Sequence, residues 1–263
     1  MPEALKYAFI FAFGAAVGSF LNVCIHRIPR GISVVSPGSR CPACGSSIRF
    51  YDNIPIISYV FLLGRCRNCN APISAEYPLV ELLVAAAGVF LYGWFGLTAA
   101  FALNFILVSA LVAITFIDLR HRIIPNVISL PGIAAGFIMS VIASYPDVYS
   151  GAASSLLGLS AGGVVLIAIS AAYYFVARQA GMGGGDVKLL AMIGAFLGWK
   201  GVLFTLFAGS FAGAAVGAAL MLVWGKKSKY AIPFGPFLAF GAVTYIFYGK
   251  KLFWWYITSV WQV

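Results

Sequence analysis

The acidic residues of this chain are few enough to be weighed one at a time, because Asp and Glu together number 7 among 263 residues. Asp118 ends one long apolar run and Asp186 begins another, so both lie at a membrane border if these runs span a bilayer. Carboxylates in that position are costly and are functional candidates by default. Two carboxylates that share a water can serve as the base and the acid of an aspartyl protease. Asp118 and Asp186 are therefore the predicted catalytic pair.

A glycine-rich stretch directly precedes Asp186, with four glycines in the five residues from Gly181 to Gly185. Glycine lets a second backbone approach closely, and a protease must hold its substrate in an extended form beside the reacting carboxylates. We therefore predict that Gly183, Gly185 and Lys188 bind substrate.

The two aspartates differ in their predicted helix positions. Asp186 lies at an amino end and Asp118 at a carboxyl end, so the helix dipoles favour Asp186 as the ionised base and Asp118 as the proton carrier. The alternative is a local ion pair for each carboxylate. Asp118 would then pair with Arg120 or Arg122, and Asp186 with Lys188.

Four of the 5 cysteines form two Cys-x-x-Cys units that are separated by 21 residues. A two-residue spacer lets both thiolates face one ion, and two such units complete a tetrahedral set of four sulfur ligands. Thiols stay reduced in the cytoplasm, which favours a metal over two disulfides. Four thiolates leave no open coordination position, so the predicted metal is a structural zinc. The predicted ligands are Cys41, Cys44, Cys66 and Cys69.

The composition excludes a water-soluble domain, since 9% of the residues are charged and 62% are hydrophobic; about 25% charged residues would be ordinary for such a domain. A spanning helix needs about 20 apolar residues. The apolar runs predict an all-α polytopic membrane protein with about eight transmembrane helices. The predicted parts are a first transmembrane helix (1–26), a cytoplasmic zinc loop (27–76) and a transmembrane peptidase core (77–263). The predicted spans are residues 5–24, 78–96, 98–117, 127–144, 154–177, 187–199, 201–224 and 232–248.

In a membrane protein, the basic residues behind the net charge of +10 indicate how the chain is oriented in the bilayer. A soluble chain with this charge would suggest nucleic acid as a partner, whereas Lys and Arg of membrane proteins gather in cytoplasmic loops. With the amino terminus outside, 13 of the 17 basic residues fall on the inner side and 4 on the outer side. This count places the cysteine loop and both aspartates on the cytoplasmic face, and we expect no nucleic-acid partner.

Several motifs occur in a fixed order along nearly the whole chain. With them the chain resembles the type IV prepilin peptidases, bifunctional membrane enzymes that are also called prepilin leader peptidase/N-methyltransferases. Two departures from that family's pattern are Asn126, where an acid is common, and Glu76, where a basic residue is common. The motifs are the two cysteine pairs with residues 18–23, 27–29, 51–55, 77–81, 118, 124–125 and 183–189.

The resemblance implies an enzyme of the bacterial cytoplasmic (inner) membrane. Such an enzyme removes the leader peptide of type IV prepilins or pseudopilins after a glycine, on the cytoplasmic face. It then N-methylates the new terminal residue with S-adenosylmethionine. Its substrates belong to type IV pilus or type II secretion systems. The family's catalytic aspartates correspond to Asp118 and Asp186, and its zinc ligands to the four loop cysteines.

The methyltransferase half rests on this resemblance. The sequence carries no glycine-rich fingerprint of a dinucleotide-type fold, and residues 27–76 are too few to build one. The cofactor would then use the zinc loop and the membrane helix ends, where Asp52, Asn53 and Glu81 are the predicted S-adenosylmethionine ligands. Glu81, which lies inside the second predicted span, could equally pair with an arginine of the loop.

Two other functions fit parts of the sequence. One is a presenilin-like protease that cuts helices inside the membrane and has no methyltransferase activity; the zinc loop argues against it. The other is a proton-coupled transporter that uses the aspartate pair. Inverted repeats would support a transporter, and the sequence shows none.

Overall fold

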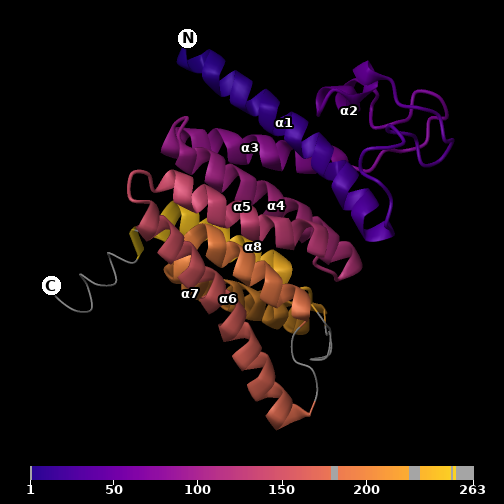
Figure 1. Ribbon diagram of the computed structural model, residues 1–263. Helices are drawn as coiled ribbons and strands as arrows, with labels where there is room; N and C mark the ends of the chain where they lie inside the picture. The colour runs from indigo at the N-terminus through magenta and orange to yellow at the C-terminus, as the bar shows by residue number, and fades with distance from the viewer. Residues whose placement is uncertain (1, 179–182, 225–231, 250, 253–263) are drawn as a thin grey trace. The chain divides into compact units, whose positions relative to one another are not determined.

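The computed structural model describes residues 2–178, 183–224, 232–249 and 251–252 (Figure 1). These residues are mostly helical and contain no β-strand, only two isolated bridges. The predicted all-α class is therefore confirmed. The elements in chain order are α1 (Glu3–Arg27), η1 (Ile28–Arg30), η2 (Phe50–Asn53), α2 (Ile57–Phe61), α3 (Glu76–Phe95), α4 (Ala99–His121), α5 (Asn126–Ala143), α6 (Val148–Ala177), α7 (Gly184–Trp224), α8 (Gly235–Thr244) and η3 (Tyr245–Gly249).

Within the described residues, 6 helices are long and apolar enough to cross a membrane, namely α1, α3, α4, α5, α6 and α7. The first five coincide with the first five predicted spans. The sixth and seventh predicted spans both lie in α7, and the eighth corresponds to a shorter apolar stretch, Gly235–Gly249. The multi-pass architecture is confirmed, while the count of eight spanning helices stays a prediction.

Helix α7 is interrupted at Gly198, whose backbone has φ 71° and ψ 178°. A positive φ of this kind is open to glycine and strained for other residues. The second half of α7 runs antiparallel to α8, because Thr205 packs on Gly241 and Gly209 on Phe237. The amino-terminal end of α7 and the segment that leads into α8 line the same cavity. The two halves of α7 therefore run in opposite directions, which agrees with the break predicted at residue 200.

The chain divides into two compact units, Met1–Ala113 and Ile114–Val263, and the division falls inside α4. The first unit contains α1, the cysteine loop, α3 and the beginning of α4. The second contains the end of α4 with α5 to α8. The structure thus groups α3 with α1 in one compact unit, and the division into functional parts at residue 77 stays a prediction.

Glycines allow close helix packing inside the first unit. A Cβ at Gly14 would come within 2.7 Å of the Ala85 Cα, and one at Gly18 would come within 2.6 Å of the Glu81 Cα. Helices α1 and α3 therefore touch backbone to backbone, as small residues permit in membranes. This contact holds the two ends of the cysteine loop together.

Glycines also allow close packing between α6 and the first half of α7 in the second unit. Gly158 of α6 lies directly against Gly194, and Gly162 lies against the Leu190 carbonyl. Neither α6 position has room for a side chain. This packing fixes the first half of α7, which carries the predicted catalytic Asp186 in its first turn.

Candidate active site and metal centre

Asp118 lies near the carboxyl end of α4 and is buried, with 5% of its surface exposed. Its Oδ2 accepts a hydrogen bond from the backbone N–H of Gly235, with an N–O distance of 3.0 Å. Gly235 is the first residue of α8. A Cβ at this position would lie 2.6 Å from Asp118 Oδ2, so only glycine brings its amide this close without displacing the carboxylate.

Asp186 lies in the first turn of α7, and its backbone N–H donates to the Gly183 carbonyl at 3.1 Å. Asp118 and Asp186 line one cavity of about 650 Å³. They are close enough for their charges to interact. The structure therefore brings the predicted catalytic pair together within one compact unit, although 68 positions separate them (186 − 118).

The glycines before Asp186 form part of the cavity wall. Gly183 and Gly185 both line it. A Cβ at Gly185 would come within 3.0 Å of the Ile124 side chain, so a larger residue would crowd the passage. Gly181, the first glycine of the run, lies outside the described residues.

Two cations, Arg122 and Lys188, also line the cavity. Lys188 Nζ donates to Asn126 Oδ1 at 2.8 Å. Asn126 begins α5, so this hydrogen bond ties the first turn of α7 to that helix. The neutral partner of Lys188 leaves the Asp186 carboxylate without the local lysine bond that the alternative interpretation required.

The two cysteine pairs adopt the same backbone turn. In the first, the Cys41 N–H donates to the Ser46 carbonyl, and the Gly45 N–H donates back to Cys41. The second repeats both bonds with Cys66, Ala71 and Asn70, at the same spacing and the same 2.9 Å distances. The residue after the second cysteine has a positive φ in each case, 72° at Gly45 and 56° at Asn70.

The four sulfurs of these turns gather at one point. Cys41, Cys44, Cys66 and Cys69 place their Sγ atoms within 4.8 Å of one another. The Cys41 and Cys69 sulfurs are 3.8 Å apart; Zn–S bonds of about 2.3 Å in a tetrahedron give nearly the same S–S separation, about 3.8 Å. All 5 cysteines, including the buried Cys24 of α1, are free of disulfides. The donor set therefore fits the predicted structural zinc.

Hydrogen bonds favour the metal-binding thiolate form at one cysteine of each turn, Cys44 and Cys66, whereas contacts with the neighbouring sulfurs, that of Cys44 first, raise the pKa of Cys69 to about 12. The Ser46 hydroxyl and then its backbone N–H lower the pKa of Cys44 to about 6. The backbone N–H groups of Cys69 and Asn68 lower the pKa of Cys66. A thiolate is the species that ligates metal, so these turns are prepared to hold a cation.

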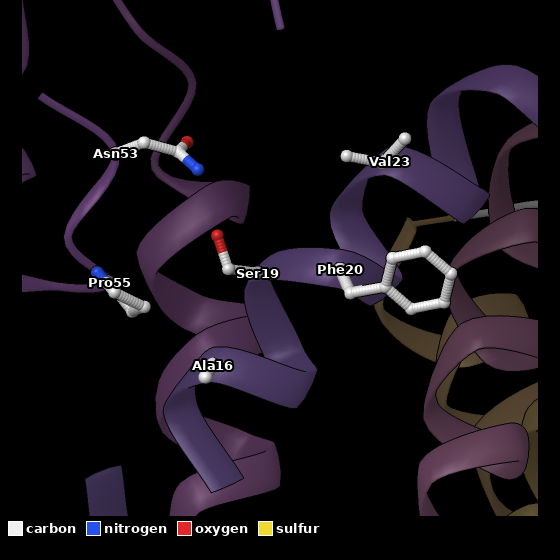
Figure 2. A pocket seen from close by; sticks show the side chains of 6 residues that line it. All are labelled: Ala16, Ser19, Phe20, Val23, Asn53 and Pro55. Carbon is white, nitrogen blue, oxygen red and sulfur yellow. The ribbon is translucent and has the colours of Figure 1, made fainter. Parts of the chain in front are cut away.

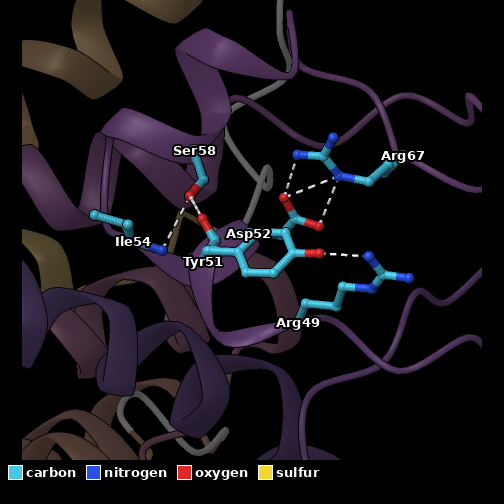
Figure 3. A network of polar contacts seen from close by, with 6 residues as sticks. All are labelled: Arg49, Tyr51, Asp52, Ile54, Ser58 and Arg67. Carbon is cyan, nitrogen blue, oxygen red and sulfur yellow. Dashed lines mark hydrogen bonds and ion pairs between the residues drawn. The ribbon is translucent and has the colours of Figure 1, made fainter.

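Asp52, one predicted cofactor ligand, is engaged by an arginine (Figure 3). Arg67 Nη2 and Nε donate to its two carboxylate oxygens at 2.6 and 2.9 Å. Hydrogen bonds from Arg67 also lower the pKa of the Asp52 carboxyl. Arg67 lies between Cys66 and Cys69, while Asp52 lies in η2, so the ion pair ties the second cysteine turn to η2.

Asn53 and Glu81, the other two candidates, lie at different places. Asn53 lines a cavity of about 300 Å³ with Pro55 and with Ser19 of α1 (Figure 2). Glu81 is buried in α3, with 7% of its surface exposed, and its Oε2 accepts the Ile56 N–H at 2.7 Å. The structure thus places Asn53 at a cavity and Asp52 in an ion pair, while Glu81 is hydrogen-bonded to the loop at Ile56.

The segment Ile232–Phe234, with Gly235, is the part of the candidate active site that sequence reasoning missed. Residues 232–234 line the cavity of the aspartates, and Gly235 bonds Asp118. A signal was present, since Ile-Pro-Phe-Gly-Pro interrupts the beginning of the last apolar run. Proline at the first turn and glycine beside it are typical of a helix start that approaches another group closely.

Comparison with known proteins gives two family matches along the chain. Residues 12–95 match the Bacterial Peptidase A24 N-terminal domain, and residues 105–218 match the Type IV leader peptidase family. The matched segments fall mainly into the first and second structural units, respectively.

Curated relatives match over most of the chain. A prepilin leader peptidase/N-methyltransferase of Aeromonas hydrophila is 36% identical and covers 97% of this chain and 95% of its own. Proteins of the same name from Pseudomonas aeruginosa and Myxococcus xanthus are 33% and 39% identical, over 91% and 83% of this chain and 89% and 64% of their own. No solved structure matches the chain.

Proposed function

The chain belongs to the type IV leader peptidase family, and from that premise we propose that it is a bifunctional aspartic peptidase and N-methyltransferase. It removes the leader of type IV prepilins or pseudopilins after a glycine, on the cytoplasmic face of the bacterial inner membrane. It then methylates the new terminal amine. The observation that carries the peptidase half is the convergence of Asp118 and Asp186 in one cavity.

In this proposal Asp118 is the base. The Gly235 N–H can only donate, so its hydrogen bond to Asp118 Oδ2 is stronger when that carboxylate is ionised. This assignment reverses the one that the helix dipoles alone favour. A specific hydrogen bond at 3.0 Å outweighs a dipole effect, which is worth about 0.3–1 kcal/mol near a helix end. Asp186 then carries the proton.

The chemistry needs only these two carboxylates and one water. Asp118 takes a proton from the water while the water oxygen bonds to the scissile carbonyl carbon. At the same time Asp186 gives its proton to the carbonyl oxygen. The tetrahedral intermediate then collapses. The C–N bond breaks, the amine receives the proton from Asp118, and Asp186 recovers one from the hydroxyl.

The substrate backbone would lie along the glycine wall. Gly183 and Gly185 present no side chains there, and Ile124 narrows the passage opposite Gly185. A glycine at the substrate's cleavage position would add no side chain to this narrow passage. Lys188, held by Asn126, and Arg122 supply donors for the substrate's carbonyl groups.

The methyltransferase half would use the first unit. Bound there, S-adenosylmethionine would supply a methyl group to the free amine and leave as S-adenosylhomocysteine, and the amine would lose a proton. Asn53 is the best supported of the three predicted ligands, because its side chain lines a cavity. Glu81 and Asp52 have structural roles instead: Glu81 accepts a hydrogen bond from the loop residue Ile56, and Asp52 forms an ion pair with Arg67. Zinc held by the four cysteines would keep the loop folded and take no part in the chemistry.

One assay tests both halves. The purified protein in lipid nanodiscs is incubated with a prepilin and with S-adenosylmethionine that carries a labelled methyl group; mass spectrometry then follows cleavage and methylation separately. Asp118→Asn and Asp186→Asn should each reduce the cleavage rate by about 10²–10⁴-fold, because an amide does not exchange the required proton. The double variant should be no slower than either single variant, since groups that act as a unit are not additive.

The control is methyl transfer to a pilin that was cleaved beforehand, which should persist in both variants. Cleavage near the wild-type rate by either variant would reduce that aspartate to a structural role. Loss of both activities together would indicate a folding defect, which the zinc content of the purified variants would reveal.

A further inference from the structure

The loop between α1 and α3 contains a segment that is too apolar for water. Residues 54–63 read Ile-Pro-Ile-Ile-Ser-Tyr-Val-Phe-Leu-Leu and include α2. Their large side chains point outward: Val60 is 62% exposed, Phe61 83% and Leu63 85%. Scattered apolar residues on a surface are ordinary, but a contiguous group marks an interaction site.

The beginning of this segment is fixed beside the membrane helices. The Ile56 N–H donates to Glu81 Oε2 at 2.7 Å. Glu81 is the sixth residue of α3 (Glu76–Phe95); at about 1.5 Å per residue it lies about 7.5 Å inside the start of that helix. Pro55 lines a cavity with Ala16, which precedes the end of α1 at Arg27 by about 16 Å on the same measure. The segment is therefore held well inside the ends of two spanning helices.

A buried carboxylate holds this attachment against local strain. Ile56 has a φ of 62°, an unfavourable conformation for a β-branched residue. Glu81 is buried, and its carboxylate also meets the Ser19 hydroxyl of α1. The strained turn persists because α1 and α3 together supply the acceptor for its amide.

Several backbone N–H groups of the segment bond within the segment, and that of Ile56 bonds Glu81. The Ile54 N–H donates to Ser58 Oγ, and the Ser58 N–H returns to the Ile54 carbonyl, both at 3.0 Å. Further along, the N–H groups of Leu62, Leu63 and Gly64 donate to carbonyls three to five residues back. A segment in hydrocarbon must satisfy its amides internally, whereas a loop in water has no such need.

Polar groups lie on both sides of the segment. Arg49 and the Asp52–Arg67 ion pair precede or flank it, and Arg65 follows it. Tyr51 lies between the two arginines, with Arg67 5.7 Å from its ring centre. Arginines and tyrosines are the residues that accompany apolar groups at the headgroup level.

We infer that residues 54–63 enter the lipid bilayer at the end of α1 and α3, with Phe61 and Leu63 in contact with acyl chains. The zinc loop is then fastened to the membrane surface, with Glu81 setting its depth. This inference does not depend on either enzymatic activity.

Photocrosslinking in native membranes tests the inference. p-Benzoylphenylalanine replaces Phe61 or Leu63, and in a control it replaces Asn68 at the exposed tip of the second cysteine turn. After irradiation, mass spectrometry of the full-length protein should show lipid adducts at positions 61 and 63, at least tenfold above those at position 68. In the Phe61 reporter protein, Glu81→Leu should reduce the adduct yield several-fold, whereas Glu81→Gln should keep it, because the glutamine oxygen still accepts the Ile56 N–H.

Two outcomes would overturn the inference. One is crosslinking of positions 61 and 63 to another part of this chain or to another protein, with lipid adducts no higher than at position 68. The other is free labelling of a cysteine placed at 61 by a reagent that cannot enter membranes. Both readouts remain available if the protein lacks peptidase activity.

Discussion

A single backbone amide decides how Asp118 is held. The Gly235 N–H bonds its Oδ2, and the absence of a side chain at 235 makes this approach possible. Within the described structure, the backbone N–H groups that bond the Asp186 carboxylate come from its own turn, namely from Gly183 and Asp186 itself, and not from another helix. Two identical side chains thus receive different environments, which is the asymmetry that an aspartyl pair needs.

Gly235→Ala should therefore slow leader cleavage by at least tenfold. The new Cβ would lie 2.6 Å from Asp118 Oδ2, so either the carboxylate or the start of α8 must move. Rates of cleavage and of methyl transfer to a pilin cleaved beforehand are measured on the same preparation, and only cleavage should fall.

The matched control is Gly163→Ala in α6, where a Cβ meets nothing within 4 Å. This variant should cleave at close to the wild-type rate. If Gly235→Ala does the same, its amide is not what positions Asp118.

At the scale of elements, the cysteine loop is built from two copies of one turn. Each copy presents two sulfurs, and the Arg67–Asp52 ion pair ties the second copy to η2. Local hydrogen bonds shape each turn, whereas the two turns meet through their sulfurs. A metal shared by the four sulfurs would hold the two turns together.

Replacing Cys66 by Ser should release zinc, because three thiolates and a hydroxyl bind this ion less well than four thiolates. We expect about one zinc per chain in the wild type by elemental analysis, and at least a tenfold loss of affinity in the variant when a chelator competes for the metal.

Cys24→Ala is the control, since Cys24 is buried in α1 and lies outside the cluster. Its zinc content should equal that of the wild type. A wild-type protein without metal, or with the loop cysteines paired as disulfides in cells, would contradict the zinc assignment.

At the scale of the whole molecule, the two structural units follow the two family matches. The cysteine loop belongs to the unit of Met1–Ala113, and the aspartate cavity to that of Ile114–Val263. This division provides a physical reason to expect cleavage and methylation to fail independently. The orientation of the chain in the membrane, by contrast, is predicted from the basic residues of both units together.

The basic residues predict that orientation. A cysteine that replaces Tyr149, in the exposed first turn of α6, should react in intact cells with a maleimide that cannot cross the inner membrane. A cysteine that replaces Arg122, beside the active site, should react only after the membrane is opened. The reverse pattern would show that the charge count assigns the wrong side and would place the cavity outside.

The sequence by itself determined the features that depend on composition and short spacing. Apolar runs of spanning length specify membrane helices, and a two-residue spacer specifies a cysteine turn, because each follows from local geometry. Aspartates at the borders of such runs were recognisable for the same reason. The break near residue 200 was also foreseen, although only the structure shows that α7 reverses direction at Gly198.

Only the tertiary structure decided which distant groups complete each site. Gly235 bonds Asp118 across 117 positions, and Asn126 bonds Lys188 across 62. The Ile56 N–H likewise bonds the Glu81 carboxylate across 25 positions. The Gly235 and Ile56 donors are backbone amides, which nearly every residue possesses, and the contacts depend on how helices pack. No residue type or spacing in the sequence could therefore pair these two donors with Asp118 and Glu81.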